Sequence, residues 1–128
     1  MSALARSAPP TRKRILIVED DSSSRIALVK LLGWGYEVIA APDGLEGFDA
    51  ALRNPPDLII SDVTMPKLDG FNMVRRLRAK GIKAPVIFVT ARDRAQDVIA
   101  GIQSGARHYI TKPIHIDDLE DKIRKILG

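Results

Sequence analysis

The sequence predicts a single α/β domain in which five short parallel strands alternate with five helices. Three observations lead to this prediction. The chain has 128 residues, close to the usual size of one domain. Five short runs rich in β-branched residues are spread along it, and a helical pattern of apolar residues follows each run. Five strand–helix units in succession indicate a parallel sheet that right-handed crossovers cover on both faces.

The expected strands are short and mostly apolar. Three of them are almost wholly apolar, which is typical of strands buried on both faces of a parallel sheet. The five runs are residues 14–18, 36–40, 57–61, 85–89 and 107–111.

The expected helices carry apolar residues three or four positions apart, which places these residues on one face of each helix. Asp21 is a good N-cap for the first helix, and Gly81 and Gly105 stand where the third and fourth should end. Gly47 lies inside the second helix at a cost of up to about 1 kcal/mol relative to alanine, without an evident reason. Trp34 is expected to pack in a turn. The predicted buried faces are Ile26, Val29 and Leu32; Leu45, Phe48 and Leu52; Phe71, Val74 and Leu77; Ala95, Val98 and Ile102; and Leu119, Ile123 and Ile126.

Composition excludes several classes of protein. The chain has no cysteine, which excludes disulfides, thiolate zinc sites and cysteine catalysis. No apolar run approaches the roughly 18 residues that a membrane span requires, and the N-terminus lacks the apolar core of a secretory signal. We therefore expect a cytoplasmic protein without a membrane partner.

The net charge of +4 comes from the first residues of the chain. Residues 1–14 contain four basic and no acidic residues, so the remainder sums to zero. We expect residues 1–12 to form a flexible basic arm and residues 13–128 to form the folded domain. A nucleic-acid-binding domain would carry its basic residues on one folded face. The arm is therefore interpreted as a solvated leader, and no direct nucleic-acid binding is expected.

Polar residues gather where ligands of an open parallel sheet bind, beyond the carboxyl ends of the strands. Singly, each has a more ordinary explanation as a cap, a strand residue or a solvated charge. Together, one group after each of four strands, they favour a reactive site. These groups are Glu19, Asp20 and Asp21; Ser61 and Asp62; Thr90 and Ala91; and Thr111, Lys112 and Pro113.

The residue types suit phosphoryl transfer. Clustered carboxylates repel one another and need a cation, and Mg²⁺ prefers such oxygen ligands. A carboxylate can also act as a nucleophile and form an acyl phosphate. The ammonium of Lys112 and the hydroxyl of Thr90 would then stabilise the charge on the phosphoryl oxygens.

Four segments carry a resemblance to a known family: ILIVEDD, LIISDVTMPKLDG, VIFVTA and GARHYITKPI. Through them the sequence resembles the response-regulator receiver domains of two-component signalling, over about residues 13–127. The resemblance implies a flavodoxin-like (βα)5 sandwich with strand order 2-1-3-4-5. It also implies that the peptide bond between Lys112 and Pro113 is cis.

The resemblance further implies the roles of the site residues. Asp62 would be the phosphoacceptor, and Glu19, Asp20, Asp62 and the backbone carbonyl of Thr64 would bind Mg²⁺, with Mn²⁺ as a possible substitute. Glu19 would reach the metal through water. Thr64 would also tune the phosphoryl lifetime together with Arg92, two positions after the hydroxyl residue. Neither side chain suits the orientation of an attacking water, so slow spontaneous hydrolysis is expected.

Switching is implied by the same resemblance. Thr90, Ala91 and Lys112 would contact the phosphoryl group, and Tyr109 would turn inward as the hydroxyl of Thr90 moves. Phosphorylation would shift an existing equilibrium between two forms. The surface of the fourth helix, fifth strand and fifth helix would then change and be read by a downstream protein.

The expected phosphodonor is a histidine kinase or a histidine phosphotransfer protein, with Ser23, Ser24, Ala27 and Ile114 as candidate contacts. A monomer or weak dimer is expected, because Arg107 and His108 stand where regulators that dimerise through this surface often carry acids. A stand-alone relay module is preferred, with a receiver cut from a longer, for example DNA-binding, regulator as the alternative.

A more distant alternative is an enzyme, a phosphatase like the haloacid dehalogenases. That family carries a second acid two residues after its aspartate nucleophile, where this chain has Thr64. The chain is therefore expected to catalyse only its own phosphorylation and slow dephosphorylation.

Overall fold

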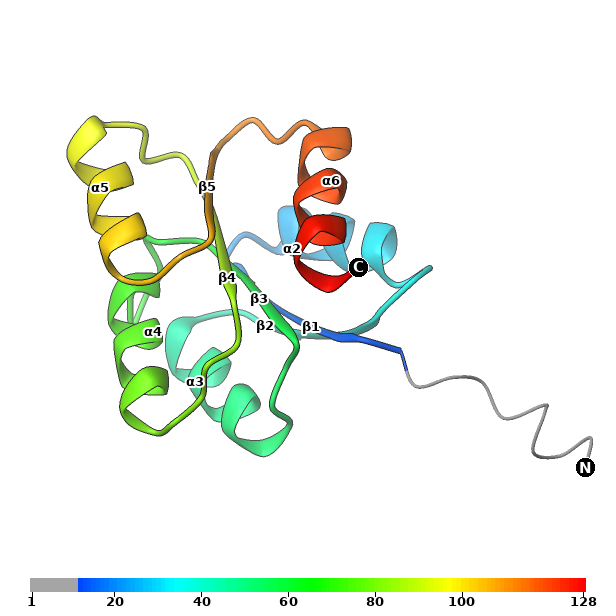
Figure 1. Ribbon diagram of the computed structural model, residues 1–128, viewed down its shortest axis with the longest axis horizontal. Helices are drawn as coiled ribbons and strands as arrows, with labels where there is room; N and C mark the ends of the chain where they lie inside the picture. The colour runs from blue at the N-terminus through cyan, green and yellow to red at the C-terminus, as the bar shows by residue number, and fades with distance from the viewer. Residues whose placement is uncertain (1–11) are drawn as a thin grey trace, which may run out of the picture.

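The computed structural model describes residues 12–128, which form a five-stranded sheet flanked by helices (Figure 1). Of the predicted arm, residues 1–11 lie outside the described residues. The expected strands are confirmed to within one residue at each end. In chain order the elements are β1 (Arg14–Val18), α2 (Ser22–Leu32), β2 (Glu37–Ala41), α3 (Gly44–Arg53), β3 (Leu58–Ser61), α4 (Gly70–Ala79), β4 (Val86–Thr90), α5 (Ala95–Gln103), β5 (His108–Thr111) and α6 (Ile116–Leu127).

The sheet has the order β2-β1-β3-β4-β5, and every neighbouring pair is parallel, which confirms the predicted fold class. Helices α2 and α6 cover one face, and α3, α4 and α5 cover the other (Figure 1). Successive strand residues alternate between the two faces. In β1, Ile15 and Ile17 therefore join the core under α2 and α6, while Leu16 and Val18 join the core under the other three helices.

Helix α3 buries a different face from the predicted one. Leu45 and Leu52 are 42% and 37% exposed, whereas Gly47, Ala50 and Ala51 are buried. A Cβ at Gly47 would lie 2.8 Å from Val18 Cγ2. The helix packs so close to the sheet that only small residues fit beneath it, which accounts for the glycine.

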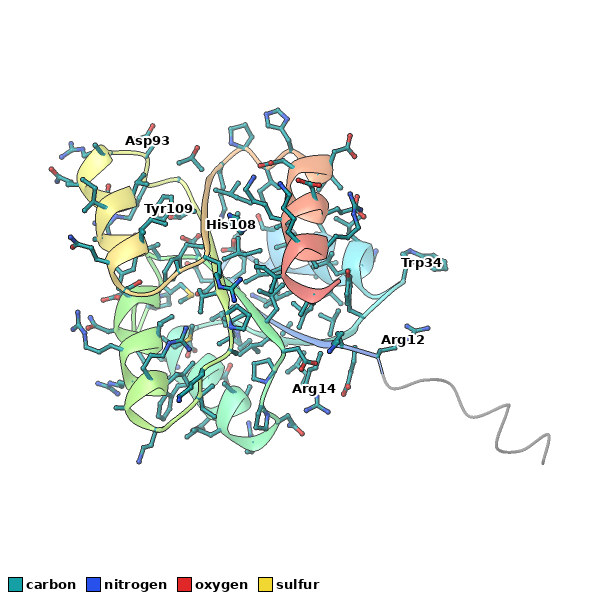
Figure 2. The ribbon with its side chains drawn as sticks, viewed as in Figure 1. Arg12, Arg14, Trp34, Asp93, His108 and Tyr109 are labelled. Carbon is teal, nitrogen blue, oxygen red and sulfur yellow. The ribbon has the colours of Figure 1, made fainter. Side chains whose placement is uncertain are left out.

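Four further packing predictions were wrong. Ala95, at the start of α5, is exposed. Ile26 of α2 and Ile102 of α5 are about half exposed, and α5 instead turns Asp97 and Gly101 inward. Trp34 is 87% exposed and points away from the body of the molecule (Figure 2). The predicted faces of α4 and α6 are confirmed at Val74, Leu77, Leu119 and Ile123, all of which are buried.

Loops place the helices at the edge of the sheet where the polar groups gather. Asp21 caps α2, as predicted, by accepting a hydrogen bond from the Ser24 N–H at 2.8 Å. Asp69 caps α4 in the same way, and Gly81 ends α4 with a positive φ of 84°.

Within residues 12–128, no helix combines the length and apolar character needed to cross a membrane.

Candidate functional site

Three predicted carboxylates come together at the carboxyl ends of β1 and β3. Glu19, Asp20 and Asp62 each offer an oxygen, and these oxygens lie within 4.8 Å of one another. Glu19 and Asp62 are only 3% and 8% exposed, whereas Asp20 is exposed. The cluster is therefore buried on one side and open to solvent on the other.

The backbone fixes this cluster. The Asp62 N–H donates to the Val18 carbonyl at 2.9 Å, which ties the two strand ends together. The Val63 N–H donates to Asp62 Oδ1 at 2.6 Å and orients the carboxylate. Helix α4 begins against the same residue, because a Cβ at Gly70 would lie 2.3 Å from the Asp62 carbonyl oxygen. Only glycine permits this approach.

Lys112, the residue that follows β5, bridges two of the three carboxylates. Its Nζ lies 2.7 Å from Glu19 Oε1 and 3.1 Å from Asp62 Oδ2. The Lys112 N–H donates to the Thr90 carbonyl at 2.8 Å, and the peptide bond to Pro113 is cis. A cation from the far end of the chain thus lies between the two buried carboxylates.

Burial and ion pairing shift the pKa values of Glu19 and Lys112. Burial raises the pKa of Glu19, and it outweighs the opposing hydrogen bond from Lys112. Burial alone would lower the pKa of Lys112, but hydrogen bonds to Glu19 and Asp62 outweigh it and raise that pKa. The direction for Lys112 follows from its short contacts to two carboxylates, so the lysine is an ammonium.

The donor set fits a small divalent cation. Carboxylate oxygens are the ligands that Mg²⁺ prefers, and it usually binds one or two of them and keeps several waters. Exposed Asp20 provides an open side for water, next to buried Glu19 and Asp62. Thr64, in the loop after Asp62, is also exposed.

The predicted switch residues lie around the end of β4. Thr90 is buried, and its Oγ1 accepts a hydrogen bond from the Arg92 N–H at 3.3 Å. The Tyr109 hydroxyl donates to the Arg92 carbonyl at 2.8 Å, and burial raises the pKa of Tyr109. Tyr109 lies on β5 facing α5 (Figure 2). Ala91 is exposed next to Thr90.

Sequence reasoning missed two residues of this region. Asp97 Oδ1 forms an ion pair with Arg92 Nη2 at 2.8 Å and is itself only 8% exposed. Gly101 gives the Tyr109 ring its space, because a Cβ there would lie 2.6 Å from Tyr109 Cδ2. The only signal in the sequence was the glycine within a helical pattern, which marks Gly101 and not Asp97.

A groove lies beside Lys112, between α2 and the loop that follows β5. Its volume is about 440 Å³, and most of its lining is apolar. Of the predicted kinase contacts, Ser24, Ala27 and Ile114 line it, while Ser23 does not. The lining residues are Ser24, Ala27, Leu28, Leu31, Lys112, Pro113, Ile114 and Ile116.

Comparison with known proteins places the chain in a family. The family model of the response regulator receiver domain matches residues 15–124. Response regulator MprA of Mycobacterium sp. (strain KMS) is 40% identical over 115 residues, which are 89% of this chain and 50% of that protein. MprA of Mycobacterium leprae (strain TN) has the same identity and coverage. The chain spans about half the length of the curated relatives that it matches.

Solved structures agree with this placement. The N-terminal domain of an uncharacterised protein (WS1339) from Wolinella succinogenes has a TM-score of 0.85 at 36% identity, with 89% of this chain and 93% of that chain covered. The receiver domain of Francisella response regulator 1452 has a TM-score of 0.84 at 31% identity, with 89% and 95% covered. Chemotaxis protein CheY4 of Vibrio cholerae has a TM-score of 0.83 at 29% identity, with 91% and 99% covered. The chain belongs to the receiver domain family of two-component response regulators.

Proposed function

We propose that the chain accepts a phosphoryl group on Asp62, with Mg²⁺ or Mn²⁺ held by Glu19, Asp20, Asp62 and the Thr64 carbonyl. The observation that carries this proposal is the pairing of Lys112 with two buried carboxylates at a cluster open on one side. The bound cation would neutralise charge on the phosphoryl oxygens and hold them in line.

The residues of the chain supply the nucleophile and its surroundings. The Val63 N–H holds Asp62 Oδ1, while Oδ2 faces the ammonium of Lys112. Asp62 attacks phosphorus, a P–O bond forms to its carboxylate, and the bond to the donor breaks. Lys112 then exchanges a carboxylate partner for a phosphoryl oxygen, so the charge that arrives meets a cation already in place.

Phosphorylation is coupled to the surface through Thr90 and Tyr109. Both side chains now bind the backbone of Arg92, one through its N–H and the other through its carbonyl. Movement of the Thr90 hydroxyl toward a phosphoryl oxygen would break the first contact and release the segment that holds the second. The surface of α5, β5 and α6 would change as a result, and a downstream protein would read it.

The proposed phosphodonor is a histidine kinase or a histidine phosphotransfer protein that docks at the groove beside α2. This groove is apolar and borders Lys112, so a helix seated there would bring a phosphohistidine near Asp62. The proposal holds for a receiver that acts alone and for one within a longer regulator. It predicts no turnover of a generic aryl phosphate.

The decisive experiment is intact mass measurement after incubation with acetyl phosphate, with Mg²⁺ or with EDTA. We expect one phosphoryl adduct on the native protein with Mg²⁺ and none on the Asp62→Asn variant. Asp49→Asn, which changes an exposed carboxylate of α3, is the matched control and should behave as the native protein. An adduct that persists in Asp62→Asn, or none at all with Mg²⁺ present, would contradict the proposal.

The phosphoryl lifetime is a separate part of the proposal. Thr64 and Arg92 offer no carboxylate or amide to orient an attacking water, so the adduct should hydrolyse slowly once acetyl phosphate is removed. Rapid spontaneous loss of the adduct would show that another group activates water.

A further inference from the structure

A second groove lies away from the carboxylate cluster, between α4 and α5, which are neighbours on one face of the sheet (Figure 1). Its volume is about 430 Å³, within the range of small-molecule sites. Phe71 and Ala100 contribute apolar lining, and the remaining lining includes two guanidinium groups and an amide. The lining residues are Phe71, Arg75, Arg78, Ala100, Gln103 and Ser104.

The charge of this region is one-sided. Residues 70–83 contain five basic and no acidic residues. Among residues 12–128, neither Arg75 nor Arg78 forms an ion pair with a carboxylate. The groove is therefore lined by two cations that have no carboxylate partner among the described residues.

Both guanidinium groups are held in position by neutral oxygens. Arg75 Nη1 donates to Asn72 Oδ1 at 2.8 Å, and Arg78 Nη1 donates to the Ile82 carbonyl at 2.9 Å. Burial lowers the pKa of Arg78, which reflects loss of hydration without a compensating negative charge. An anion in the groove would restore that compensation, and guanidinium groups bind carboxylate and phosphate oxygens in a fork.

Phe71, one of the lining residues, contacts the aromatic residues near the proposed switch. The Phe71 ring packs edge-on against Phe88 at a centroid distance of 5.1 Å. The Arg92 guanidinium carbon lies 6.0 Å from the centroid of the Phe71 ring. Phe88 in turn lies 6.3 Å from the Tyr109 ring. A ligand that touched Phe71 would therefore act on the residues that surround Thr90 and Tyr109.

From these observations we infer that the groove between α4 and α5 binds a small organic anion with an aromatic body, and that this ligand biases the switch. The acidic group binds Arg75 and Arg78, and the ring packs on Phe71 and Ala100. The binding step is independent of the proposed phosphorylation, whereas the bias on the switch rests on it. By linkage, if the ligand shifts the equilibrium of the switch toward one form, that form must bind the ligand more tightly than the other form does.

The test uses naphthalene-1-sulfonate as the probe, which has an aromatic body and one anionic group and cannot donate phosphate. Two-dimensional ¹H–¹⁵N NMR of the unphosphorylated protein should show shifts centred on Phe71, Ala100, Gln103 and Ser104. Neutral 1-naphthol and inorganic sulfate are the matched probes, and each should bind far more weakly. Arg75→Gln should weaken binding about tenfold, the loss of one charge-assisted contact.

Arg76→Gln is the matched protein control, because it removes the same charge from an exposed position of the same helix outside the groove. Equal affinities in the two variants, or shifts centred elsewhere, would overturn the site. Groove signals that move with protein concentration alone would overturn it too, because a second copy would then be the occupant. Shifts that require an added protein partner and not the probe would also refute it.

The coupling is measured by repeating the titration with beryllofluoride and Mg²⁺, which mimic the phosphoryl group on Asp62. The probe affinity should change on the order of fivefold, a typical coupling between two sites. An unchanged affinity, with beryllofluoride binding at Asp62 confirmed by NMR, would overturn the effector role. If beryllofluoride fails to bind at all, the proposed phosphoacceptor function fails instead, and the probe titration of the free protein still decides the groove.

Discussion

Replacing Lys112 by methionine tests the electrostatic balance of the carboxylate cluster. The substitution keeps the length of the side chain and removes its charge. Lys112 Nζ hydrogen-bonds both Glu19 and Asp62, whose side chains are only 4% and 10% exposed. Without the ammonium, two buried carboxylates would face each other with no cation.

Loss of one partner of a buried ion pair costs about 3–5 kcal/mol. The Lys112 side chain is 25% exposed, so solvent screens part of the interaction, and we expect a loss of about 2–4 kcal/mol in the free energy of unfolding. Urea denaturation followed by circular dichroism, in EDTA at pH 7.5, measures this loss. Because a cation that binds the native cluster stabilises it, the loss should shrink as Mg²⁺ is added.

The variant should also depend on pH in a defined direction. Burial already raises the pKa of Glu19, and removal of Lys112 takes away the hydrogen bond and charge that oppose this rise, so the pKa of Glu19 in the folded state lies further above its value in the unfolded state. The native state then binds more protons than the unfolded state, so its stability falls as pH rises. The loss in Lys112→Met should therefore be larger at pH 8 than at pH 5.

Lys67→Met is the matched control. Lys67 also pairs with an aspartate, Asp43, but at 3.6 Å and with 62% of its side chain exposed. Although Asp43 is buried, solvent screens the exposed Lys67 ammonium, so we expect this pair to contribute at most about 1 kcal/mol. The reasoning is refuted if Lys112→Met costs no more than Lys67→Met, or if its cost is the same in EDTA and in saturating Mg²⁺.

Three further predictions concern packing and charge around Tyr109 and His108 of β5. Gly101→Ala should destabilise the protein by about 1–2 kcal/mol, because the added Cβ would meet the Tyr109 ring. In a Tyr109→Ala background the same substitution should stabilise the protein by up to about 1 kcal/mol. If urea denaturation shows no such change of sign, the contact is contradicted. Asp97→Asn breaks the ion pair that holds the Arg92 side chain, so the Tyr109 ring signals in NMR should broaden or move, whereas Asp93→Asn, an exposed neighbour, should leave them unchanged. Burial and the charges of Lys122, Lys125 and Arg107 lower the pKa of His108. The unfolded state therefore binds more protons than the folded state, and stability falls as pH drops below about 6.5. The His108→Gln variant should lose stability less steeply than the native protein between pH 7 and pH 5. If the stability of both proteins falls equally over this range, titration of His108 is not the cause.

The fold could be predicted from the sequence because its signals are local. The strands are apolar runs with clear ends, and a chain of strand–helix units allows few topologies. The strand order came from the family resemblance, since the two-residue periodicity of a strand says nothing about its neighbour. Periodicity failed at α3 and α5, where Leu45 and Ile102 follow the helical pattern and yet are exposed. Both helices approach the sheet through glycine, which carries no apolar signal.

The site was predictable in its members and less so in their contacts. Glu19, Asp62 and Lys112 each follow a strand, and parallel strands end at one edge of a sheet, so their meeting could be anticipated. The ion pair between Arg92 and Asp97 could not, because it depends on how α5 is placed relative to the loop before it. Trp34 was predicted to pack in a turn but is 87% exposed, and nothing in the structure explains its position.

Glycines connect the helices on one face of the sheet to the site. A Cβ at Gly47 would strike Val18, which precedes Glu19; one at Gly70 would strike the Asp62 carbonyl; and one at Gly101 would strike Tyr109. Gly47 and Gly101 lie inside helices, where a glycine lowers stability by about 1 kcal/mol relative to alanine, whereas Gly70 is the first residue of α4. That cost is offset by close approach, because α3, α4 and α5 then pack directly against the strand ends that carry the carboxylate cluster, the proposed phosphoacceptor Asp62 and the proposed switch residue Tyr109. A displacement of a few tenths of an ångström at Val18, Asp62 or Tyr109 would therefore move the backbone of the neighbouring helix, because the glycine there has no side chain to absorb it.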